Sequence, residues 1–358
     1  MSDPEKQSEP GQWNVYVTRK IPQEGLDVFQ EAPPGSQTAG KAAPGGQGEG
    51  RPAFNVQVNP HDRVLSRQEL LAAVRGAHGL ITMLNENIDA EVMDAAGPQL
   101  RVIGNYAVGF NNIDLAAATQ RGIVVCNTPG VLTETTADLA WALLMASARR
   151  VVEGDHMVRA GQFQGWAPML LLGQDVYGKT LGIVGFGRIG QAVARRARGF
   201  DMRVVYYSAH RRPPEEEQAL GATYLPLDEL LRQADFVSLH VNLTPATRHL
   251  IDERALSLMK PTAHLINTAR GPVVDEAALV RALREGRIAG AGLDVFENEP
   301  ALAPGLKDLP NVTLLPHAGS ASIPTRTRMA VMIAQDVRAV LQGQRPAHPV
   351  NTEVLEAR

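Results

Sequence analysis

Three ionisable side chains follow apolar segments in the second half of the chain. Arg270 comes after HLINT, Glu299 after AGAGLDVF and His317 after NVTLL. Arginine presents a planar fork of donors that can grip carboxylate and carbonyl oxygens, and histidine can donate a proton near neutral pH. A carboxylate bonded to that histidine would favour its charged form and fix its orientation. Together the three could bind a 2-oxo acid and protonate its carbonyl oxygen, whereas singly such an arginine is usually an ion-pair partner and such a histidine often only caps a helix.

A glycine-rich turn stands between an apolar, strand-like segment, LGIVG, and a helix-like run, AVARRARGF. In a dinucleotide-binding turn the first glycine makes the tight bend, the second lets the backbone approach the pyrophosphate, and the third lets helix and strand meet. The helix that follows offers free N–H groups and the positive end of its dipole to the phosphates. We therefore predict that a dinucleotide binds at Gly185, Phe186, Gly187, Arg188, Ile189 and Gly190.

The next predicted strand ends without the acidic residue that accepts hydrogen bonds from the ribose of NAD. Its end carries Ser208, Ala209, His210, Arg211 and Arg212, and no carboxylate comes before Glu215. A hydroxyl and two guanidinium groups can bind the 2'-phosphate of NADP, which a carboxylate would repel. The segment predicts that NADP is preferred and NAD is the alternative, unless Arg211 and Arg212 are only solvated loop charges.

Apolar, strand-like segments alternate with helix-like ones along most of the chain, and this alternation predicts βαβ units. The predicted fold class is α/β, with two Rossmann-like, doubly wound parallel sheets. Ligands of such sheets gather beyond the carboxyl ends of the strands, where the three ionisable residues lie. The predicted strands are 14–18, 54–58, 79–83, 100–104 and 123–127, then 181–185, 203–208, 236–241, 264–268, 289–295 and 312–316. The predicted helices include 23–31, 66–74, 89–96, 275–285, 324–341 and a long one at 133–160, interrupted at most once.

Composition narrows the class of protein further. The chain has 358 residues, enough for two domains, and its net charge of −3 argues against nucleic acid as a partner. Its one cysteine, Cys126, excludes an internal disulfide and fits a small buried residue in a reducing compartment. No secretory signal or membrane-spanning run is evident, so we expect a soluble, cytoplasmic protein. Residues 32–52 are almost wholly Gly, Pro, Ala and polar, and predict a flexible insertion.

At this point the sequence resembles the D-isomer-specific 2-hydroxyacid dehydrogenase family, and within it the glyoxylate and hydroxypyruvate reductases. The resemblance covers nearly all of residues 13–351, apart from the 32–52 insertion. Its most specific stretches are GKTLGIVGFGRIGQAVARRA, LINTARGPVVDEAALVRALREGRIAGAGLDVFENEP and LLPHAGSAS. It implies that Arg270, Glu299 and His317 are the catalytic set.

The resemblance also implies a division of the chain into domains. A discontinuous substrate domain is expected from residues 12–126 and 319–348, with a dinucleotide-binding domain, 127–318, inserted into it. A homodimer is expected around the predicted helix 133–160. The segment 161–172, with Phe163, Trp166 and Met169, is expected either to reach the partner's pocket or to take part in ordinary dimer packing.

Further site residues follow from matching positions. The motif NYAVGFNNID resembles the family loop whose backbone amides receive the substrate carboxylate, which implies Val108 and Gly109; its usual histidine is here Asn112. Asn85 is expected to close the substrate pocket. Asp294 is expected to hold the nicotinamide amide, with a structural carboxylate as the alternative. Besides the glycine turn and residues 208–212, the implied cofactor contacts are Thr268, Ala269, Arg270, Asp294, His317, Ala318 and Gly319.

The expected activity is NADPH-dependent reduction of glyoxylate or hydroxypyruvate to glycolate or D-glycerate. The partner is then a small 2-oxo or 2-hydroxy acid, with no metal, membrane or nucleic acid required. Two alternatives stay open: another member of the family, acting on 3-phosphoglycerate or D-lactate, or a dinucleotide-sensing corepressor that binds without turnover. A phosphorylated substrate would require additional cations, and the first domain offers no Lys or Arg cluster near Val108.

Overall fold

The computed structural model describes residues 12–31 and 53–356, so the predicted insertion at 32–52 lies outside the described residues. The chain folds as two compact units. The terminal unit comprises Met1–Val131 and Ser322–Arg358, and the central unit comprises Leu132–Ala321. These limits lie close to the predicted domain boundaries, and the function predicted for each domain stays a prediction.

The terminal unit contains a five-stranded parallel sheet with the strand order β2-β1-β3-β4-β5. Its strands are β1 (Gln12–Val17), β2 (Ala53–Val58), β3 (Gly79–Thr82), β4 (Val102–Asn105) and β5 (Val124–Cys126). All five lie within two residues of the predicted strands. The inner strands β3 and β4 and the neighbouring β5 are buried along their whole length, as expected of parallel strands covered on both faces. Cys126 is a free, buried cysteine, as predicted.

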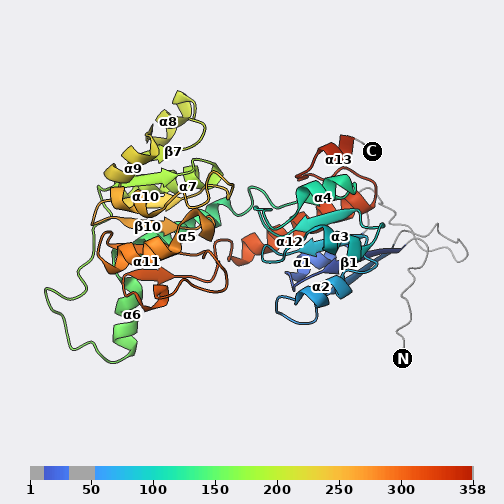
Figure 1. Cartoon of the computed structure of the whole chain (residues 1–358), viewed down its shortest axis with the longest axis horizontal. Helices are drawn as coiled ribbons and strands as arrows, with labels where there is room; N and C mark the ends of the chain where they lie inside the picture. Colours follow the sequence, from blue (N-terminus) through green and yellow to red (C-terminus); the bar gives the residue numbers. More distant parts are fainter. Residues whose placement is uncertain (1–11, 32–52, 357–358) are drawn as a thin grey trace, which may run out of the picture. The chain divides into compact units, whose positions relative to one another are not determined.

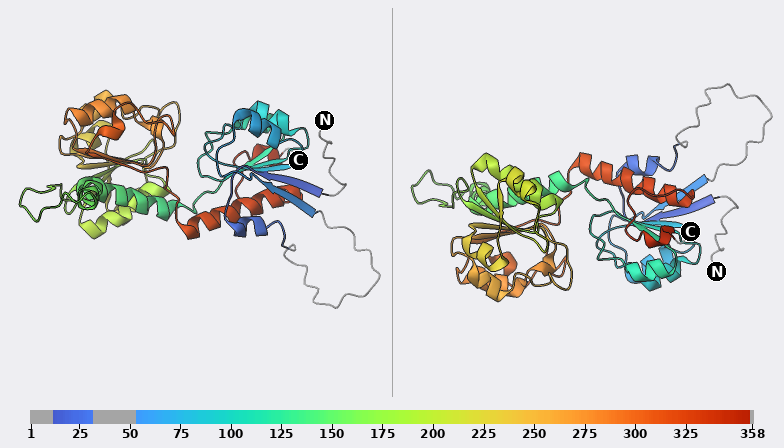
Figure 2. Two further views of the ribbon diagram at one scale, coloured as in Figure 1. Left: turned by 90° about the horizontal axis from the view of Figure 1, so that it is seen from below. Right: turned by 90° about the horizontal axis from the view of Figure 1, so that it is seen from above.

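Helices cover both faces of this sheet (Figure 2). One face carries α1 (Gln23–Asp27) and α12 (Ile323–Leu341), so the last long helix returns to the first part of the chain. The other carries α2 (Arg67–Ala73), α3 (Ala90–Ala96) and α4 (Leu115–Gln120), and α13 (Glu353–Glu356) follows near the end of the chain. Ser66 caps α2 with a capping box and Asp89 caps α3, which explains why both helices begin where predicted.

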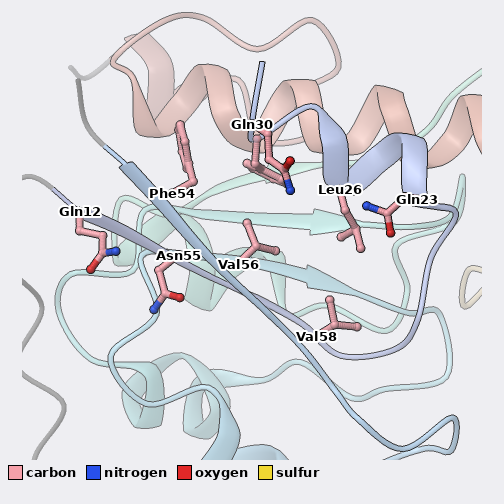
Figure 3. A pocket seen from close by; sticks show the side chains of 9 residues that line it. Gln12, Gln23, Leu26, Gln30, Phe54, Asn55, Val56 and Val58 are labelled. Atoms are coloured by element: carbon pink, nitrogen blue, oxygen red, sulfur yellow. The ribbon is translucent and has the colours of Figure 1, made fainter. Parts of the chain in front are cut away.

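A pocket of about 350 Å³ opens beside the edge strand β2, under α1 (Figure 3). Its lining combines apolar side chains with amides: Gln12, Gln23, Leu26, Phe29, Gln30, Phe54, Asn55, Val56 and Val58. None of the site residues predicted from the sequence lines it, and no ionisable side chain is present among the described residues that line it. The pocket is therefore unsuited to acid–base chemistry.

The central unit contains a seven-stranded parallel sheet with the order β12-β11-β10-β9-β6-β7-β8. Apart from the additional edge strand β12, this is the strand order of a dinucleotide-binding fold, with its switch point between β6 and β9. The strands are β6 (Thr180–Val184), β7 (Arg203–Tyr207), β8 (Ala222–Tyr224), β9 (Phe236–Leu239), β10 (His264–Asn267), β11 (Gly290–Leu293) and β12 (Val312–Leu314). The sequence did not predict β8, which is three residues long.

Helices also flank both faces of the second sheet (Figures 1 and 2). One face packs against α5 (Thr133–Ala148) and α7 (Arg188–Ala197), the other against α9 (Leu227–Gln233), α10 (Glu253–Leu258) and α11 (Glu276–Arg284); α8 (Pro214–Leu220) precedes β8. The predicted helix 133–160 is interrupted once. Arg150 adopts a left-handed φ of 53°, and α6 (Val151–Arg159) begins there with no buried residue. In the described part of the chain, no helix has both the length and the apolar character needed to cross a bilayer.

Candidate active site

The glycine turn lies at the switch point of the central sheet, directly after β6. Gly185 has a φ of +96°, and a Cβ there would lie 2.6 Å from the carbonyl carbon of His240, the residue after β9. A Cβ on Gly190 would lie 2.2 Å from the oxygen of Gly185, so this glycine lets α7 meet the strand. A Cβ on Gly187 would meet nothing within 4 Å. Packing therefore requires glycine at positions 185 and 190. At Gly187 there is open space of the kind that a phosphate approaching the start of α7 requires.

Tyr206 of β7 and Arg212 of the following loop both contact this turn. The ring of Tyr206 stacks on Phe186 with centroids 4.0 Å apart, and the backbone N–H of Arg212 donates to the Tyr206 hydroxyl at 2.9 Å. The Nε of Arg212 donates to the carbonyl oxygen of Phe186 at 3.0 Å. Arg211 forms an ion pair with Glu217 on α8, at 2.9 Å. Glu217 was not among the residues predicted from the sequence, and it neutralises part of the positive charge expected of this segment.

His317 and Glu299 form a hydrogen-bonded pair, with 2.9 Å between Nδ1 and Oε2. The other oxygen of Glu299 accepts from the backbone N–H of Phe296 at 3.0 Å. His317 adopts a left-handed φ of 57°, a strained conformation for a non-glycine residue that is typical of functional sites. Burial raises the pKa of Glu299, but the hydrogen bond and charge of His317 outweigh it and hold that pKa below its usual value. The carboxylate is therefore ionised and accepts from the imidazole.

Arg270 lies near this pair because it follows the adjacent strand β10. Asn267 shapes its backbone, since the Asn267 side chain donates to the carbonyl oxygen of Arg270 at 3.0 Å and accepts from the N–H of Ala269 at 3.0 Å. Burial lowers the pKa of Arg270, while the charge of Glu299 acts in the opposite direction. A guanidinium stays protonated in proteins, so the site holds a partly desolvated cation.

The three predicted catalytic residues therefore come together at the carboxyl ends of three adjacent strands, β10, β11 and β12. The segments that carry Arg270 and Glu299 also touch. A Cβ on Gly271 would lie 1.9 Å from the carbonyl carbon of Phe296, a separation that only glycine permits. The arrangement can bind an anion at Arg270 and deliver a proton from His317.

Two buried polar atoms at the same edge have no hydrogen-bond partner among the described residues: Oδ2 of Asp294 and Oγ1 of Thr268. The other oxygen of Asp294 accepts from the backbone N–H of Ala318 at 2.6 Å, and a Cβ on Gly319 would lie 3.3 Å from Oδ2. Burial raises the pKa of Asp294, although the Ala318 N–H opposes that shift. Buried polar atoms in native proteins are nearly always satisfied, so these two atoms fit groups that bind a ligand. With the open space at Gly187, these atoms are compatible with a bound dinucleotide.

The predicted substrate residues Asn85, Val108 and Gly109 lie in the terminal unit, where hydrogen bonds join the two loops that carry them. The side chain of Asn112 donates to the carbonyl oxygens of Met83 and Glu86, each at 3.1 Å. Asn105 donates to the carbonyl oxygen of Gly109 at 2.8 Å, and Asn127 to that of Val108 at 2.7 Å. The asparagine that replaces the expected histidine thus links the loop after β3 to the loop after β4.

Glu276, in the first turn of α11, is a further residue of this site that was not predicted from the sequence. It is 3% exposed, and its two oxygens accept from the backbone N–H groups of Glu297, at 2.6 Å, and Ala303, at 3.3 Å. It therefore anchors both ends of the segment that contains Glu299. Glu276 follows Asp275, the N-cap of α11, so in the sequence it resembles an ordinary acidic residue of a first helical turn. In the part of the chain that the structure describes, no cluster of three or more His, Cys, Asp or Glu residues could hold a metal ion.

Comparison with known proteins agrees with this geometry. Residues 141–319 match the NAD binding domain of the D-isomer specific 2-hydroxyacid dehydrogenases. A glyoxylate reductase of Thermococcus gammatolerans is 50% identical over 348 residues, which are 96% of this chain and 97% of that protein.

Two solved structures are similar over most of the chain. A protein of Thermus thermophilus is 48% identical with a TM-score of 0.82, over 94% of this chain and 99% of its own. An NADPH-dependent glyoxylate/hydroxypyruvate reductase of Sinorhizobium meliloti, solved with NADP and malonate, is 33% identical with a TM-score of 0.77, over 94% and 96%. The family model, the full-length identity and the shared fold agree, and the chain belongs to the D-isomer specific 2-hydroxyacid dehydrogenases.

Proposed function

We propose that this dehydrogenase reduces glyoxylate, and hydroxypyruvate as a second substrate, to glycolate and D-glycerate with NADPH as the hydride donor. The observation that carries the proposal is the 2.9 Å pair of His317 and Glu299 at the same sheet edge as Arg270. The glyoxylate reductase of Thermococcus gammatolerans, 50% identical over nearly its whole length, supports this choice of substrate.

Each residue has a distinct role in the proposed reaction. Arg270 binds the carboxylate of the oxo acid and polarises its carbonyl group through the planar guanidinium. His317 donates its proton to the carbonyl oxygen, and Glu299 orients the imidazole through the 2.9 Å hydrogen bond to Nδ1. The backbone amides of Val108 and Gly109 receive the carboxylate, and Asn85 closes the substrate pocket. The reduced nicotinamide supplies the hydride to C2 of the substrate when it is bound.

The cofactor contacts are proposed along the same sheet edge. The turn at Gly185–Gly190 receives the pyrophosphate, and Thr268 and Asp294 use their unpartnered oxygens toward the nicotinamide end. Ser208, Arg211 and Arg212 bind the 2'-phosphate, and the positive charge of the two arginines is why we propose NADP as the preferred cofactor. The NADPH-dependent reductase of Sinorhizobium meliloti, 33% identical, is consistent with this preference.

We also propose that the active form is a homodimer. The helix α6 buries no side chain, and the segment after it exposes large apolar residues: Phe163 is 52% exposed, Trp166 84% and Met169 76%. Three large apolar side chains exposed within seven residues of the chain are unusual on a monomer and favour a protein interface. Sedimentation of wild type and of Trp166→Lys measures this: we expect dimers that dissociate more readily in the variant.

The single, buried Cys126 suits a reducing compartment, for which we propose the cytoplasm.

The activity is tested by following NADPH and NADH oxidation at 340 nm with glyoxylate, hydroxypyruvate, pyruvate and phosphohydroxypyruvate. We expect the fastest turnover with glyoxylate and NADPH. In His317→Ala we expect kcat to fall about 10²- to 10⁴-fold while NADPH still binds, because only the proton donor is lost. His61→Ala, an exposed histidine of the terminal unit, is the matched control. Faster reduction of another oxo acid would overturn the substrate, and binding of NADPH without any turnover would favour a dinucleotide sensor.

A further inference from the structure

Glu217 is an acidic residue buried beside a segment that is expected to bind a phosphate. It is 8% exposed and belongs to α8, which follows the loop after β7. Its two oxygens accept from Nε and Nη2 of Arg211, both at 2.9 Å, and one of them also accepts from the Tyr206 hydroxyl at 2.6 Å. Arg211 and Tyr206 hold the pKa of Glu217 at about 2, so the carboxylate is charged at any working pH.

This carboxylate controls the geometry of the loop in two ways. The bidentate contact fixes the plane of the Arg211 guanidinium, whose side chain is otherwise 62% exposed. The Tyr206 hydroxyl that donates to Glu217 also accepts the backbone N–H of Arg212 at 2.9 Å. Burial, together with Glu217, raises the pKa of Tyr206 to about 12, so the phenol keeps the proton that it donates. One buried acid therefore positions both arginines of the loop.

Tyr206 also connects this arrangement to the glycine turn. Its ring stacks on Phe186, whose carbonyl oxygen accepts from the Nε of Arg212 at 3.0 Å. In a dinucleotide-binding fold, the glycine turn meets the pyrophosphate, and the end of the next strand meets the ribose 2' position. Glu217 thus stands behind the side chains that distinguish a 2'-phosphate from a 2'-hydroxyl.

We propose that Glu217 is a positioning residue for cofactor selectivity, which holds Arg211 and, through Tyr206, Arg212 in the orientation that binds the 2'-phosphate of NADPH. The inference rests on the proposed function only for the identity of the cofactor. A free arginine loses substantial side-chain entropy when it binds a phosphate, and a fixed guanidinium has already lost it. The negative charge of Glu217 has the opposite effect, because it repels the 2'-phosphate; solvent of high dielectric constant weakens this repulsion. We take the positioning effect to be the larger, because the charge is paired with Arg211.

Direct binding tests the inference without turnover. Isothermal titration of wild type, Glu217→Gln and Tyr206→Phe with NADPH, NADH and 2',5'-ADP gives the Kd values. We expect the Kd for NADPH and 2',5'-ADP to rise about tenfold in Glu217→Gln and the Kd for NADH to stay within about twofold, because the amide cannot keep both arginine bonds. Tyr206→Phe, which keeps the stacked ring, is also expected to raise the ratio of the NADPH Kd to the NADH Kd. Glu215→Gln, the same charge change at an exposed position of α8, is the matched control.

A double-mutant cycle identifies the route of the effect. If Glu217 acts through Arg211 and Tyr206, Glu217→Gln changes the ratio of the NADPH Kd to the NADH Kd by no more than about twofold once Arg211→Ala and Tyr206→Phe are both present. Tighter NADPH binding in Glu217→Gln would show that charge repulsion dominates and would overturn the inference. An equal loss for both cofactors would reduce Glu217 to a structural role and overturn it as well. Failure of the proposed reaction would instead appear as normal binding ratios without oxo-acid turnover.

Discussion

The contact between Gly271 and the segment that carries Glu299 predicts the effect of adding one methyl group. In Gly271→Ala the new Cβ would lie 1.9 Å from the carbonyl carbon and oxygen of Phe296 and 2.4 Å from the nitrogen of Glu297. All three neighbours are backbone atoms that cannot rotate away. Separations below 3.0 Å are essentially never seen for a real Cβ, so the two segments must move apart by about 1 Å.

That displacement affects stability and catalysis to different extents. Overpacking of this kind costs about 1–3 kcal/mol, and in a unit of this size it lowers the Tm by about 5 °C. The displaced atoms belong to Phe296 and Glu297. The backbone N–H of Glu297 donates to Glu276, and Glu299 follows two residues later, so the hydrogen-bonded pair of Glu299 and His317 moves with them. Misplacement of catalytic groups by about 1 Å can reduce turnover about 100-fold. We therefore expect kcat to fall about 100-fold and the Kd of NADPH to change little.

The assay combines glyoxylate turnover, NADPH titration and thermal unfolding followed by tryptophan fluorescence, to which the buried Trp141 of the central unit contributes. Gly199→Ala is the matched control, because a Cβ there meets nothing within 4 Å. A kcat within about threefold of wild type and an unchanged Tm would refute the reasoning that these two segments are locked together. If Gly271→Ala does not fold, Glu276→Gln loosens the same segment without adding an atom and should also lower kcat.

Gly187→Ala should leave the Tm of the protein within about 1 °C of wild type, because its methyl group meets no neighbour. The same methyl group should raise the Kd of NADPH about tenfold, because it fills the space through which the phosphates approach. An unchanged Kd in isothermal titration would remove Gly187 from the cofactor turn. Burial lowers the pKa of His264 from 6.5 to about 4. As the pH falls, His264 therefore becomes protonated near pH 6.5 in the unfolded chain but only near pH 4 in the folded protein. The contribution of His264 to stability is complete above about pH 6.5 and is about 2 kcal/mol lower at pH 5. Urea unfolding at pH 7 and pH 5 should therefore show that His264→Gln loses about 2 kcal/mol less than wild type; equal losses would contradict this. Asn112→Ala removes the donors that join the two loops of the terminal unit and should raise the KM for glyoxylate about tenfold at constant NADPH affinity, whereas a KM within about twofold of wild type would show that the loops hold their positions without it.

Much of the fold could be predicted because parallel strands covered on both faces appear as continuous apolar runs. The exception, β8, is a short edge strand of three residues, and it pairs with β7 through backbone groups that the sequence does not reveal. The break before α6 was also hard to locate. Arg150 takes a left-handed conformation there, and no glycine or proline marks the position.

The site could be predicted where chemistry and strand ends coincide. Arg270, Glu299 and His317 each follow a strand, so their approach required only the correct sheet order. Glu217 and Glu276 could not be found in the same way. Both stand in the first turns of helices with acidic N-terminal ends, and their importance comes from burial and from partners such as Tyr206 that a helical pattern does not show.

The course of the chain through the terminal unit has a consequence for its synthesis. The strands β1 to β5 leave the ribosome long before α12, whose Ile333 and Val337 lie so close to Gly104 that a Cβ there would approach each to 2.7 Å. Arg338 of the same helix also donates to the carbonyl oxygens of Val28 and Glu31. The nascent terminal sheet therefore lacks the α12 part of the cover on one apolar face while the whole central unit is made. Residues 132–321 are continuous, so the central unit can fold before the terminal sheet receives its last long helix, and until then the uncovered part of that sheet is apolar surface open to aggregation.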